Sequence, residues 1–381
     1  MDLAFDDEQE ALRDSVRGLL GKAYGDIEQR RETVTGGSGF DEALWLRLAE
    51  LGVLGLPFSE QDGGVGAGPV ETAVVAEELG RVLAPEPFLT SVVLAGGLVA
   101  AVGTVEDRAR VLPALNSGTL VPVFAHLEPG NRWEPAAAHV TAAESAGAWQ
   151  LSGVKEPVLQ GARADVLLAS AVLPTGGTGL FLVEGGADSM TREGYITHDG
   201  GRAARISFDG TAAAPLGPVG ADATRAIARA LDETRVAACH QALGAMTVAL
   251  SITTAYLKSR TQFGVTLNTF QALRFRAADM YVSLELARSI ALWATAVLVE
   301  GDAGPVADAA ARASLQVSRA GRHIGQEAIQ LHGGIGMTAE YSVGHYTSHL
   351  TALDHLLGDG RHHLGRLAAT VGDHDQVDPL A

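Results

Sequence analysis

The sequence predicts an α+β fold in three parts: an N-terminal α-helical domain, a middle antiparallel β-domain and a C-terminal four-helix bundle. Three observations carry this prediction. Helical periodicity runs from residue 5 to about residue 118, short runs with β character follow to about residue 220, and long helical stripes fill the remainder. We place the domain boundaries at residues 1–119, 120–220 and 221–371, and we expect a fraying polar tail over 372–381.

The N-terminal part is expected to be helical because its apolar residues recur every three or four positions. Acidic residues that can cap a helix precede one such stripe, which consists of Leu12, Val16, Leu19 and Leu20. Over residues 61–69, four glycines and a proline oppose regular structure and predict a loop. Helical periodicity resumes after this loop and continues through Leu79.

The middle part is expected to be a small antiparallel β-domain. Turns rich in glycine, proline and aspartate separate five short runs, which cover residues 121–124, 149–151, 166–170, 180–183 and 205–208. In the last run Ile206 and Phe208 alternate with Arg205 and Ser207, which predicts one buried face and one solvent-exposed face.

The C-terminal part shows the strongest periodicity. Apolar residues step by three and four through residues 236–257, 273–298 and 306–324, which predicts three long amphipathic helices. A fourth helix is expected over residues 343–357. Four such helices suit an antiparallel bundle.

Composition excludes several function classes. The 28 basic and 45 acidic side chains give a net charge of −17, which argues against nucleic acid or an anionic membrane as the main partner. The single cysteine, Cys239, excludes an internal disulfide framework, and its place on an apolar helical stripe predicts a buried residue. The acidic N-terminus does not resemble a signal peptide, and the uninterrupted apolar runs are shorter than the roughly 18 residues of a spanning helix. We therefore expect a soluble cytoplasmic protein.

Two segments of the predicted bundle carry the strongest chemical signal. Arg260-Thr261-Gln262-Phe263-Gly264 interrupts the helical pattern, and Gln330-Leu331-His332-Gly333-Gly334 begins 70 residues after Arg260. An arginine at a helix end followed by a glycine turn can present its guanidinium to a pyrophosphate. The glycines of the second segment let backbone amides approach a large planar or phosphorylated ligand. Each segment alone could be an interhelical turn, but the pair favours a binding site.

These two segments and the rest of the chain resemble the acyl-CoA dehydrogenase family of flavoproteins. The resemblance covers nearly the whole sequence and is carried by residues 45–52, 63–64, 77–81, 151–155, 164–165, 181–183 and 271–280. Residues 333–338, 340–341, 344–346 and 358–364 are most similar to small subunits of the pimeloyl-CoA dehydrogenase type.

The resemblance implies a fold, a cofactor and partners. Family members combine a helical domain, a barrel-like β-domain and a four-helix bundle, and assemble as dimers or tetramers. They bind FAD, act on an acyl-CoA substrate and pass electrons to an electron-acceptor flavoprotein. The two segments hold the FAD of the neighbouring subunit, which implies a cofactor-binding role for Arg260, Gln262, Phe263, Gly264, Gln330, Gly333 and Gly334, with Leu267 and Phe270 lining the same cofactor.

The catalytic base of the family is missing from its usual positions. The family reaction needs a carboxylate that removes a proton beside the thioester carbonyl. The common glutamate position corresponds to Leu357, and the alternative position on the first bundle helix corresponds to Thr234. Asp354, which would share a helix face with Leu357, and Asp359 are candidate bases. Glu233 precedes Thr234 but is expected to point elsewhere, because one helical residue turns by about 100°.

The β-domain also departs from the family pattern. Leu127-Glu128-Pro129 stands where members usually carry Thr-Glu-Pro. Pro157 replaces a tryptophan that packs on the flavin, and Leu159 replaces a threonine whose hydroxyl would bond to it. The segments that bind a neighbour's FAD are therefore intact, whereas the positions that would seat this chain's own flavin are altered.

Two interpretations follow from these departures. In the first, the chain is one subunit of a heterodimer or heterotetramer and shares its flavin site with a homologous partner that carries the glutamate. In the second, it is a homo-oligomeric dehydrogenase with a relocated base. The first explains both departures and is favoured. A flavin monooxygenase or oxidase on the same fold, and a non-enzymatic acyl-CoA-binding scaffold, remain as alternatives.

The histidines do not predict a metal site. Six of the 12 histidines follow residue 344, and His345 and His349 have the i, i+4 spacing of a helical metal pair. No third ligand pattern accompanies them, so we expect surface or interface packing and no metal.

Overall fold

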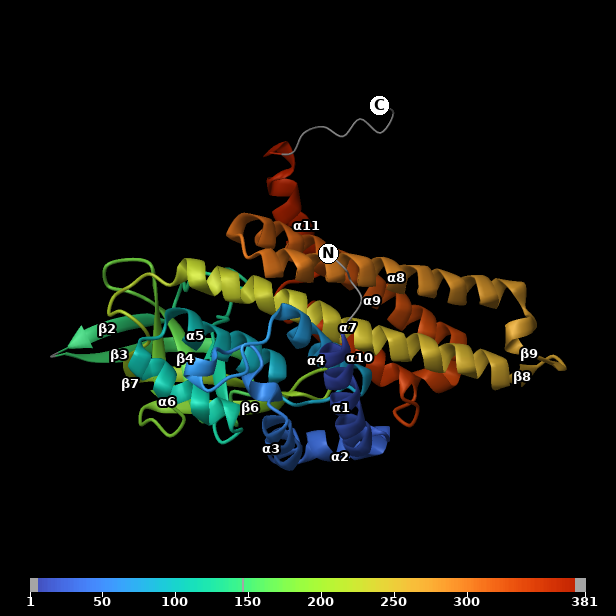
Figure 1. Ribbon diagram of the computed structural model, residues 1–381, viewed down its shortest axis with the longest axis horizontal. Coiled ribbons are helices and arrows are strands. Elements are labelled where there is room, and N and C mark those ends of the chain that lie inside the picture. The colour runs from blue at the N-terminus through green and yellow to red at the C-terminus, as the bar shows by residue number, and fades with distance from the viewer. Residues whose placement is uncertain (1–5, 146, 374–381) are drawn as a thin grey trace.

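The computed structural model describes residues 6–145 and 147–373; the N-terminus before Asp6 and the tail after Asp373 lie outside the described residues. The predicted order of a helical part, a β-part and a helical bundle is confirmed. The bundle helices run along the long axis, with the sheet at one end and the N-terminal helices against one side (Figure 1).

The N-terminal part is helical apart from the predicted glycine-rich loop, which follows a short 3-10 turn. The helices are α1 (Asp7–Tyr24), α2 (Ile27–Thr35), α3 (Glu42–Glu50), α4 (Pro69–Arg81), the π-helical η3 (Phe88–Gly96), α5 (Gly97–Val102) and α6 (Val105–Asn116). Asp6 begins α1 through a capping box, since the Gln9 amide N–H donates to its carboxylate at 2.8 Å and the Gln9 side chain accepts in return at 3.1 Å.

The β-domain is one seven-stranded sheet in the strand order β1-β4-β2-β3-β7-β5, with β6 paired to β7. The strands are β1 (Pro122–Ala125), β2 (Thr141–Ser145), β3 (Ala148–Leu159), β4 (Val166–Val172), β5 (Thr178–Glu184), β6 (Met190–Ile196) and β7 (Arg202–Pro215). The expectation of a purely antiparallel domain needs correction, because β1 and β2 both run parallel to β4. As predicted, Ile206 and Phe208 are buried while Arg205 is more exposed.

The bundle consists of α7 (Thr224–Ser259), α8 (Gln271–Glu300), α9 (Ala303–His332) and α10 (Val343–Asp354), followed by α11 (Gly360–Ala369). The small hairpin of β8 (Thr261–Gln262) and β9 (Val265–Thr266) separates α7 from α8. The fourth helix was expected to reach residue 357, and that prediction is wrong. The helix ends at Asp354, and the chain reaches α11 through Gly358, whose φ of 128° lies outside the helical region.

Two helices, α7 and α8, are long and apolar enough to cross a membrane by length and composition alone. Core helices of soluble proteins meet the same criterion, and 72% of the most apolar window of α7 is buried. The corresponding window of α8 is only 39% buried. The exposed side of α8 carries an apolar stripe, here called the α8 stripe, formed by Phe275, Val282, Leu286 and Trp293.

Helices α4 and α7 approach each other so closely that their backbones touch at two glycines. A Cβ atom on Gly80 would lie 1.8 Å from the carbonyl oxygen of Gln241. A Cβ atom on Gly244 would lie 2.0 Å from the carbonyl oxygen of Glu77. These contacts join the N-terminal part to the bundle.

We therefore expect Gly80→Ala or Gly244→Ala to lower the free energy of unfolding by about 3 kcal/mol, because neither backbone can retreat from the added methyl group. Equilibrium denaturation measures this change. The matched control is Gly18→Ala on the exposed side of α1, where nothing lies within 4 Å. This control is expected to add about 0.5–1 kcal/mol of stability. Equal effects at all three positions would contradict the close crossing.

Candidate functional site

The two segments singled out in the sequence lie at the same end of the bundle. Helices α7, α8 and α9 alternate in direction, so the end of α7, the start of α8 and the end of α9 meet beside the β8–β9 hairpin (Figure 1). The rings of Tyr256 and His332 stack with centroids 4.5 Å apart. The ring of Tyr341 packs against both, at 6.2 Å and 4.9 Å. This ring cluster fixes the two segments relative to each other.

Both segments present polar groups to the outside of the chain. Arg260 ends α7, and Phe263 and Gly264 form the tip of the hairpin with φ values of 54° and 80°. The Phe263 side chain is 89% exposed. Within the described part of the chain, no hydrogen bond or ion pair engages the side chains of Arg260, Gln262 or Gln330. A guanidinium and two side-chain amides are thus unengaged, and an exposed aromatic ring lies at the same end of the bundle.

The backbone beside these side chains is also accessible. Gly333 ends α9 with a φ of 66°, and Gly334 follows it on the surface with nothing near its Cα that a side chain would meet. Leu267 is half-buried in the turn before α8, and Phe270 begins α8 and packs edge-on against Phe263 at 6.1 Å. This donor set fits the pyrophosphate and planar rings of FAD. The cofactor-binding roles inferred from the resemblance stay predictions.

A cavity of about 360 Å³, here called the central cavity, lies between the segment preceding η3, the β-domain, α7 and α10. Its wall brings together four positions at which the sequence departs from the family pattern, namely Leu127, Pro157, Leu159 and Leu357. These four residues line one space although 230 positions separate Leu127 from Leu357 in the sequence.

This wall fits a flavin poorly. Leu127 and Leu159 offer alkyl groups, and Pro157 offers neither an aromatic face nor a backbone N–H. The His126 ring stacks on Phe124 at 4.8 Å, with Nδ1 2.8 Å from the Ser170 hydroxyl and Nε2 2.7 Å from the Glu134 carbonyl. Burial lowers the pKa of His126 to about 4, so the ring is neutral and both its nitrogens are already engaged.

A buried ion pair supports this wall from behind. The Lys155 ammonium donates to the Glu128 carboxylate at 2.7 Å. The same carboxylate accepts the backbone N–H groups of Ala138, His139 and Val140, and so holds the loop between β1 and β2. Burial lowers the pKa of Lys155 to about 8. This pair therefore holds the loop between β1 and β2 in place behind the cavity wall.

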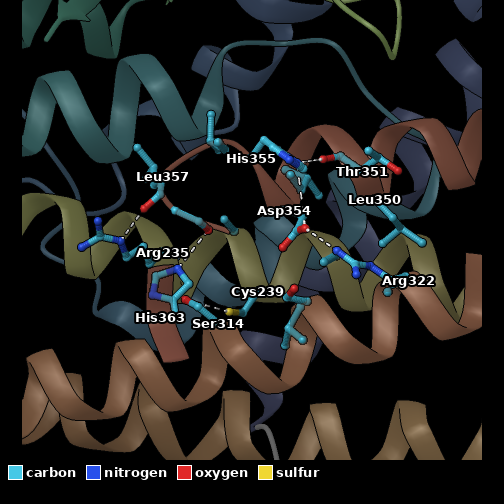
Figure 2. A pocket seen from close by; sticks show the side chains of 18 of the residues that line it. Arg235, Cys239, Ser314, Arg322, Leu350, Thr351, Asp354, His355, Leu357 and His363 are labelled. Atoms are coloured by element: carbon cyan, nitrogen blue, oxygen red, sulfur yellow. Dashed lines mark hydrogen bonds and ion pairs between the residues drawn. The ribbon is translucent and has the colours of Figure 1, made fainter. Parts of the chain in front are cut away.

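The candidate base Asp354 faces a different cavity. This bundle cavity, of about 270 Å³, lies between α7, α9 and α10 (Figure 2). The Asp354 carboxylate lies 3.8 Å from Arg322 and 3.9 Å from His355, and its Oδ1 is buried without a hydrogen-bond partner in residues 6–145 and 147–373. The expected helix face shared with Leu357 is wrong, because α10 ends at Asp354.

The second candidate base, Asp359, caps α11. Its carboxylate accepts the backbone N–H groups of Arg361 and His362 at 3.0 Å and 2.8 Å. Although burial favours the protonated form, these amides hold the pKa of Asp359 below its usual range. A carboxylate so engaged is a poor proton acceptor, and it leaves the N-terminus of α11 unavailable to a phosphate.

The residues at the two usual base positions, Thr234 and Leu357, carry no carboxylate and are held by contacts within the chain. The Thr234 hydroxyl donates to the carbonyl of Ala230 at 2.7 Å within α7. The carbonyl of Leu357 accepts from Arg235 Nε at 2.8 Å (Figure 2), and Arg235 in turn forms a 2.7 Å ion pair with Asp232. This clamp holds the loop between α10 and α11 against α7, with the Leu357 side chain at both cavities.

The remaining acid and the cysteine behave as the sequence predicted. Glu233 forms a 2.5 Å ion pair with Arg229 and lines neither cavity. Cys239 is buried on α7, and burial raises the pKa of its thiol to about 12.

The two spaced histidines have unrelated partners. His349 Nδ1 donates to Asp199 at 3.0 Å, whereas His345 Nε2 contacts the carbonyl of Ala339 at 2.9 Å. Among the residues that the structure describes, no group of three His, Cys, Asp or Glu side chains could hold a metal ion.

Sequence reasoning missed three polar residues of the central cavity, Glu86, Gln160 and Asp199. It considered His349 only for its spacing from His345 and did not place it in a cavity, where it is buried. The Gln241 amide donates to His349 Nε2 at 3.3 Å, which extends the Asp199–His349 pair across to α7. One signal could have identified Glu86, which is a carboxylate between two prolines at the edge of a strongly apolar stretch. The others have no local signal, since their partners are distant in sequence.

Comparison with known proteins matches both helical parts of the chain to domains of one protein family. A model described as "Acyl-CoA dehydrogenase, N-terminal domain" matches residues 6–119, and one described as "Acyl-CoA dehydrogenase, C-terminal domain" matches residues 224–371. The chain is 30% identical to acyl-CoA dehydrogenase IpdE2 of Mycolicibacterium smegmatis, over 96% of this chain and 99% of that protein. It is 31% identical to the human mitochondrial short-chain specific acyl-CoA dehydrogenase, over 79% of this chain and 75% of the relative.

Two solved structures are similar to nearly the whole chain. One is a Tcur3481-Tcur3483 steroid ACAD variant, with 33% identity, a TM-score of 0.86 and coverage of 96% of this chain and 98% of the other. The second is the ChsE4-ChsE5 complex from Mycobacterium tuberculosis, with 25% identity, a TM-score of 0.88 and coverage of 99% and 100%.

The capping role of Asp359 can be separated from a role as base. Asp359→Ala is expected to lower the free energy of unfolding by about 1 kcal/mol, because it removes the N-cap of α11. Asp359→Asn keeps a capping oxygen but removes the charge, so both stability and turnover by the assembled enzyme are expected to stay near wild type. Loss of turnover in a stable Asp359→Asn protein would instead identify Asp359 as the base.

Proposed function

Because this chain belongs to the acyl-CoA dehydrogenase family of FAD-dependent oxidoreductases, we propose that it is one subunit of a heteromeric acyl-CoA dehydrogenase. In that assembly it contributes the end of its bundle to an FAD seated in a homologous partner subunit. The reaction is the α,β-desaturation of an acyl-CoA thioester, and the partner subunit supplies the glutamate base. An electron-acceptor flavoprotein then reoxidises the flavin.

The observation that carries this proposal is the contrast between two parts of one chain. At the end of the bundle, Arg260, Gln262 and Gln330 have no partner among the residues that the structure describes. In the central cavity, Pro157 and Leu159 stand at the flavin-contacting positions. A chain that binds cofactor only through its outer surface needs a second subunit to provide the rest of the site.

The residues at the bundle end have distinct roles in this proposal. When bound, FAD supplies the hydride acceptor for the desaturation. The Arg260 guanidinium would hold the pyrophosphate by charge-assisted hydrogen bonds. The Gln330 side chain and the exposed amides around Gly333 and Gly334 add neutral donors, and the exposed Phe263 ring offers a flat apolar surface. These groups bind and orient the cofactor, while proton removal belongs to the partner.

The comparisons support a heteromer for a second reason. Two of the similar structures are named as pairs of different chains, Tcur3481-Tcur3483 and ChsE4-ChsE5. The first pair is described as a steroid ACAD, which supports a polycyclic acyl group as the substrate of this assembly.

The α8 stripe offers a surface for the partner. Phe275, Val282, Leu286 and Trp293 are spaced by seven, four and seven residues, so they fall on one side of the helix. Large apolar side chains gathered on one helix face are typical of an interface between subunits. We propose that the corresponding helix of the homologous subunit covers this stripe.

A second candidate function has one observation in its favour. The Oδ1 atom of Asp354 is buried beside the bundle cavity without a hydrogen-bond partner within residues 6–145 and 147–373. A carboxylate so placed could act as a relocated base in a self-sufficient homo-oligomer. Full activity of an Asp354→Asn protein would exclude this alternative.

The flavin content of the purified chain tests the shared site. Expressed alone, the chain is expected to be colourless, because its central cavity lacks the flavin contacts. Coexpressed with a glutamate-bearing homologue, it is expected to yield about one FAD per heterodimer by visible absorption, with mass measured on the same sample. Stoichiometric FAD in a homo-oligomer would overturn the proposal.

Within such an assembly, Arg260→Ala is expected to weaken FAD retention at least tenfold, since the lost charge-assisted hydrogen bonds are each worth about 1.5–3 kcal/mol. Dialysis followed by absorption spectroscopy measures the retained flavin. Lys258→Ala removes a cation two residues earlier and is the matched control, expected to retain FAD. Unchanged FAD retention in the Arg260→Ala protein would show that Arg260 does not bind the pyrophosphate.

Leu286→Glu is expected to dissociate the assembly, because it places a charge in the centre of the α8 stripe. Light scattering after size-exclusion chromatography reports the mass. Val105→Glu, which replaces another exposed apolar residue, should leave the mass unchanged. An intact assembly in Leu286→Glu would place the interface elsewhere.

A further inference from the structure

The central cavity contains buried oxygen atoms that no described side chain or backbone group satisfies. We infer that this cavity is a ligand site within this chain. It binds an uncharged, mainly hydrocarbon molecule whose hydroxyl groups donate hydrogen bonds to Glu86 and Gln160. This site needs neither FAD nor the partner subunit, so it goes beyond the proposed function and can be tested apart from it.

Glu86 provides the first free acceptor. Its side chain is only 6% exposed and lines the cavity. The Tyr24 hydroxyl donates to its Oε1 at 2.5 Å, and the backbone N–H of Asp41 donates to the same atom at 3.3 Å. Its Oε2 has no partner in the described ranges. An unsatisfied buried acceptor costs about 1–3 kcal/mol, and a hydroxyl donor from a ligand would remove that cost.

Gln160 provides the second free acceptor. It is likewise 6% exposed and lines the same cavity, and the structure records no partner for its Oε1 within the described residues. Its backbone has a φ of 56°, a region that residues other than glycine rarely adopt. The backbone N–H donates to the Arg202 carbonyl at 2.8 Å, which holds this conformation in place. Strained residues of this kind cluster at functional sites.

Apart from Glu86, most charged groups of the cavity are engaged within the chain, and Arg202 Nε is the exception among the described residues because it is buried without a partner. Arg30 donates to the carbonyl of Leu83 at 2.6 Å and to the carbonyl of Asp199 at 3.1 Å, so it joins the segment before Glu86 to the turn beside Arg202. The Asp199 carboxylate accepts from His349 at 3.0 Å. The cavity therefore offers two free acceptors and one free N–H donor, Arg202 Nε. A hydroxyl group can donate to the acceptors and accept from this N–H, and an uncharged ligand adds no further buried charge.

The rest of the lining is largely apolar. It includes Leu89, Leu94, Val123, Phe124, Leu231, Leu353 and Leu356. A volume of about 360 Å³ lies within the range of small-molecule sites. Apolar walls with a few convergent polar atoms select a ligand with a hydrocarbon body and hydrogen-bond donors at fixed points. The chemistry that fits is a hydroxylated alicyclic molecule.

The test compares two probes with one skeleton on the assembled wild-type protein. Decahydro-2-naphthol can donate a hydrogen bond, whereas 2-decalone can only accept one. Titration calorimetry is run at pH 8.5, because burial raises the pKa of Glu86 to about 7 and its carboxylate is then ionised. The groups that face Glu86 are Tyr24, Arg30 and Asp41. The alcohol is expected to bind at least tenfold more tightly than the ketone.

Two independent variants test whether Glu86 and Gln160 cause the tighter binding of the alcohol. The double variant Tyr24→Phe/Glu86→Met removes the acceptor together with its internal donor, and Gln160→Asn shortens the second acceptor while an asparagine tolerates the left-handed backbone. Each is expected to reduce the preference for the alcohol to threefold or less. Glu78→Gln changes a buried carboxylate that does not line the cavity and is expected to keep the full preference.

Equal binding of the two probes to the wild type, or no binding of either, overturns the inference. A tenfold preference that survives in both variants overturns it as well. These outcomes are independent of flavin content, so the failure of the ligand site and the failure of the heteromer proposal are distinguishable.

Discussion

The close crossing of α4 and α7 is the constraint on which the rest of the structure depends. Gly80 and Gly244 let the two backbones touch, and any side chain at either position would collide with a carbonyl oxygen. The segment that carries Glu86 follows α4 directly, and Gln241 lies on α7 at the crossing itself. The segment that carries Glu86 is therefore placed relative to α7 by backbone contact, which is far less compressible than contact between side chains.

The long helix α7 connects two sites with opposite chemistry. At one end, Arg260 and the β8–β9 hairpin leave polar groups open to a partner. Nearer its start, Arg235 is buried in an ion pair and clamps the loop that carries Leu357. One end thus leaves polar groups without partners in the described residues, whereas the other is ordered by contacts within the chain. A subunit that supports a neighbour's cofactor needs this combination, since a rigid scaffold must position the groups that it offers.

The β-domain shows that a scaffold can persist where its chemistry has changed. The Lys155–Glu128 pair and the three amides around it still hold the loop between β1 and β2. Breaking such a buried pair leaves an uncompensated charge and costs about 3–5 kcal/mol, so stability alone retains it. Pro157 and Leu159 take part in no such pair and line the central cavity instead.

The sequence by itself determined the features that depend on local period and short motifs: the three-part order, the long bundle helices, the buried face of Ile206 and Phe208, and the two segments at Arg260 and Gln330. Only the tertiary structure decided the pairing of β1 with β4, the end of α10 at Asp354 and the polar wall of the central cavity. The physical reason is separation along the chain. Tyr24 and Glu86 are 62 residues apart, and Asp199 and His349 are 150 residues apart, so no local pattern records that they meet.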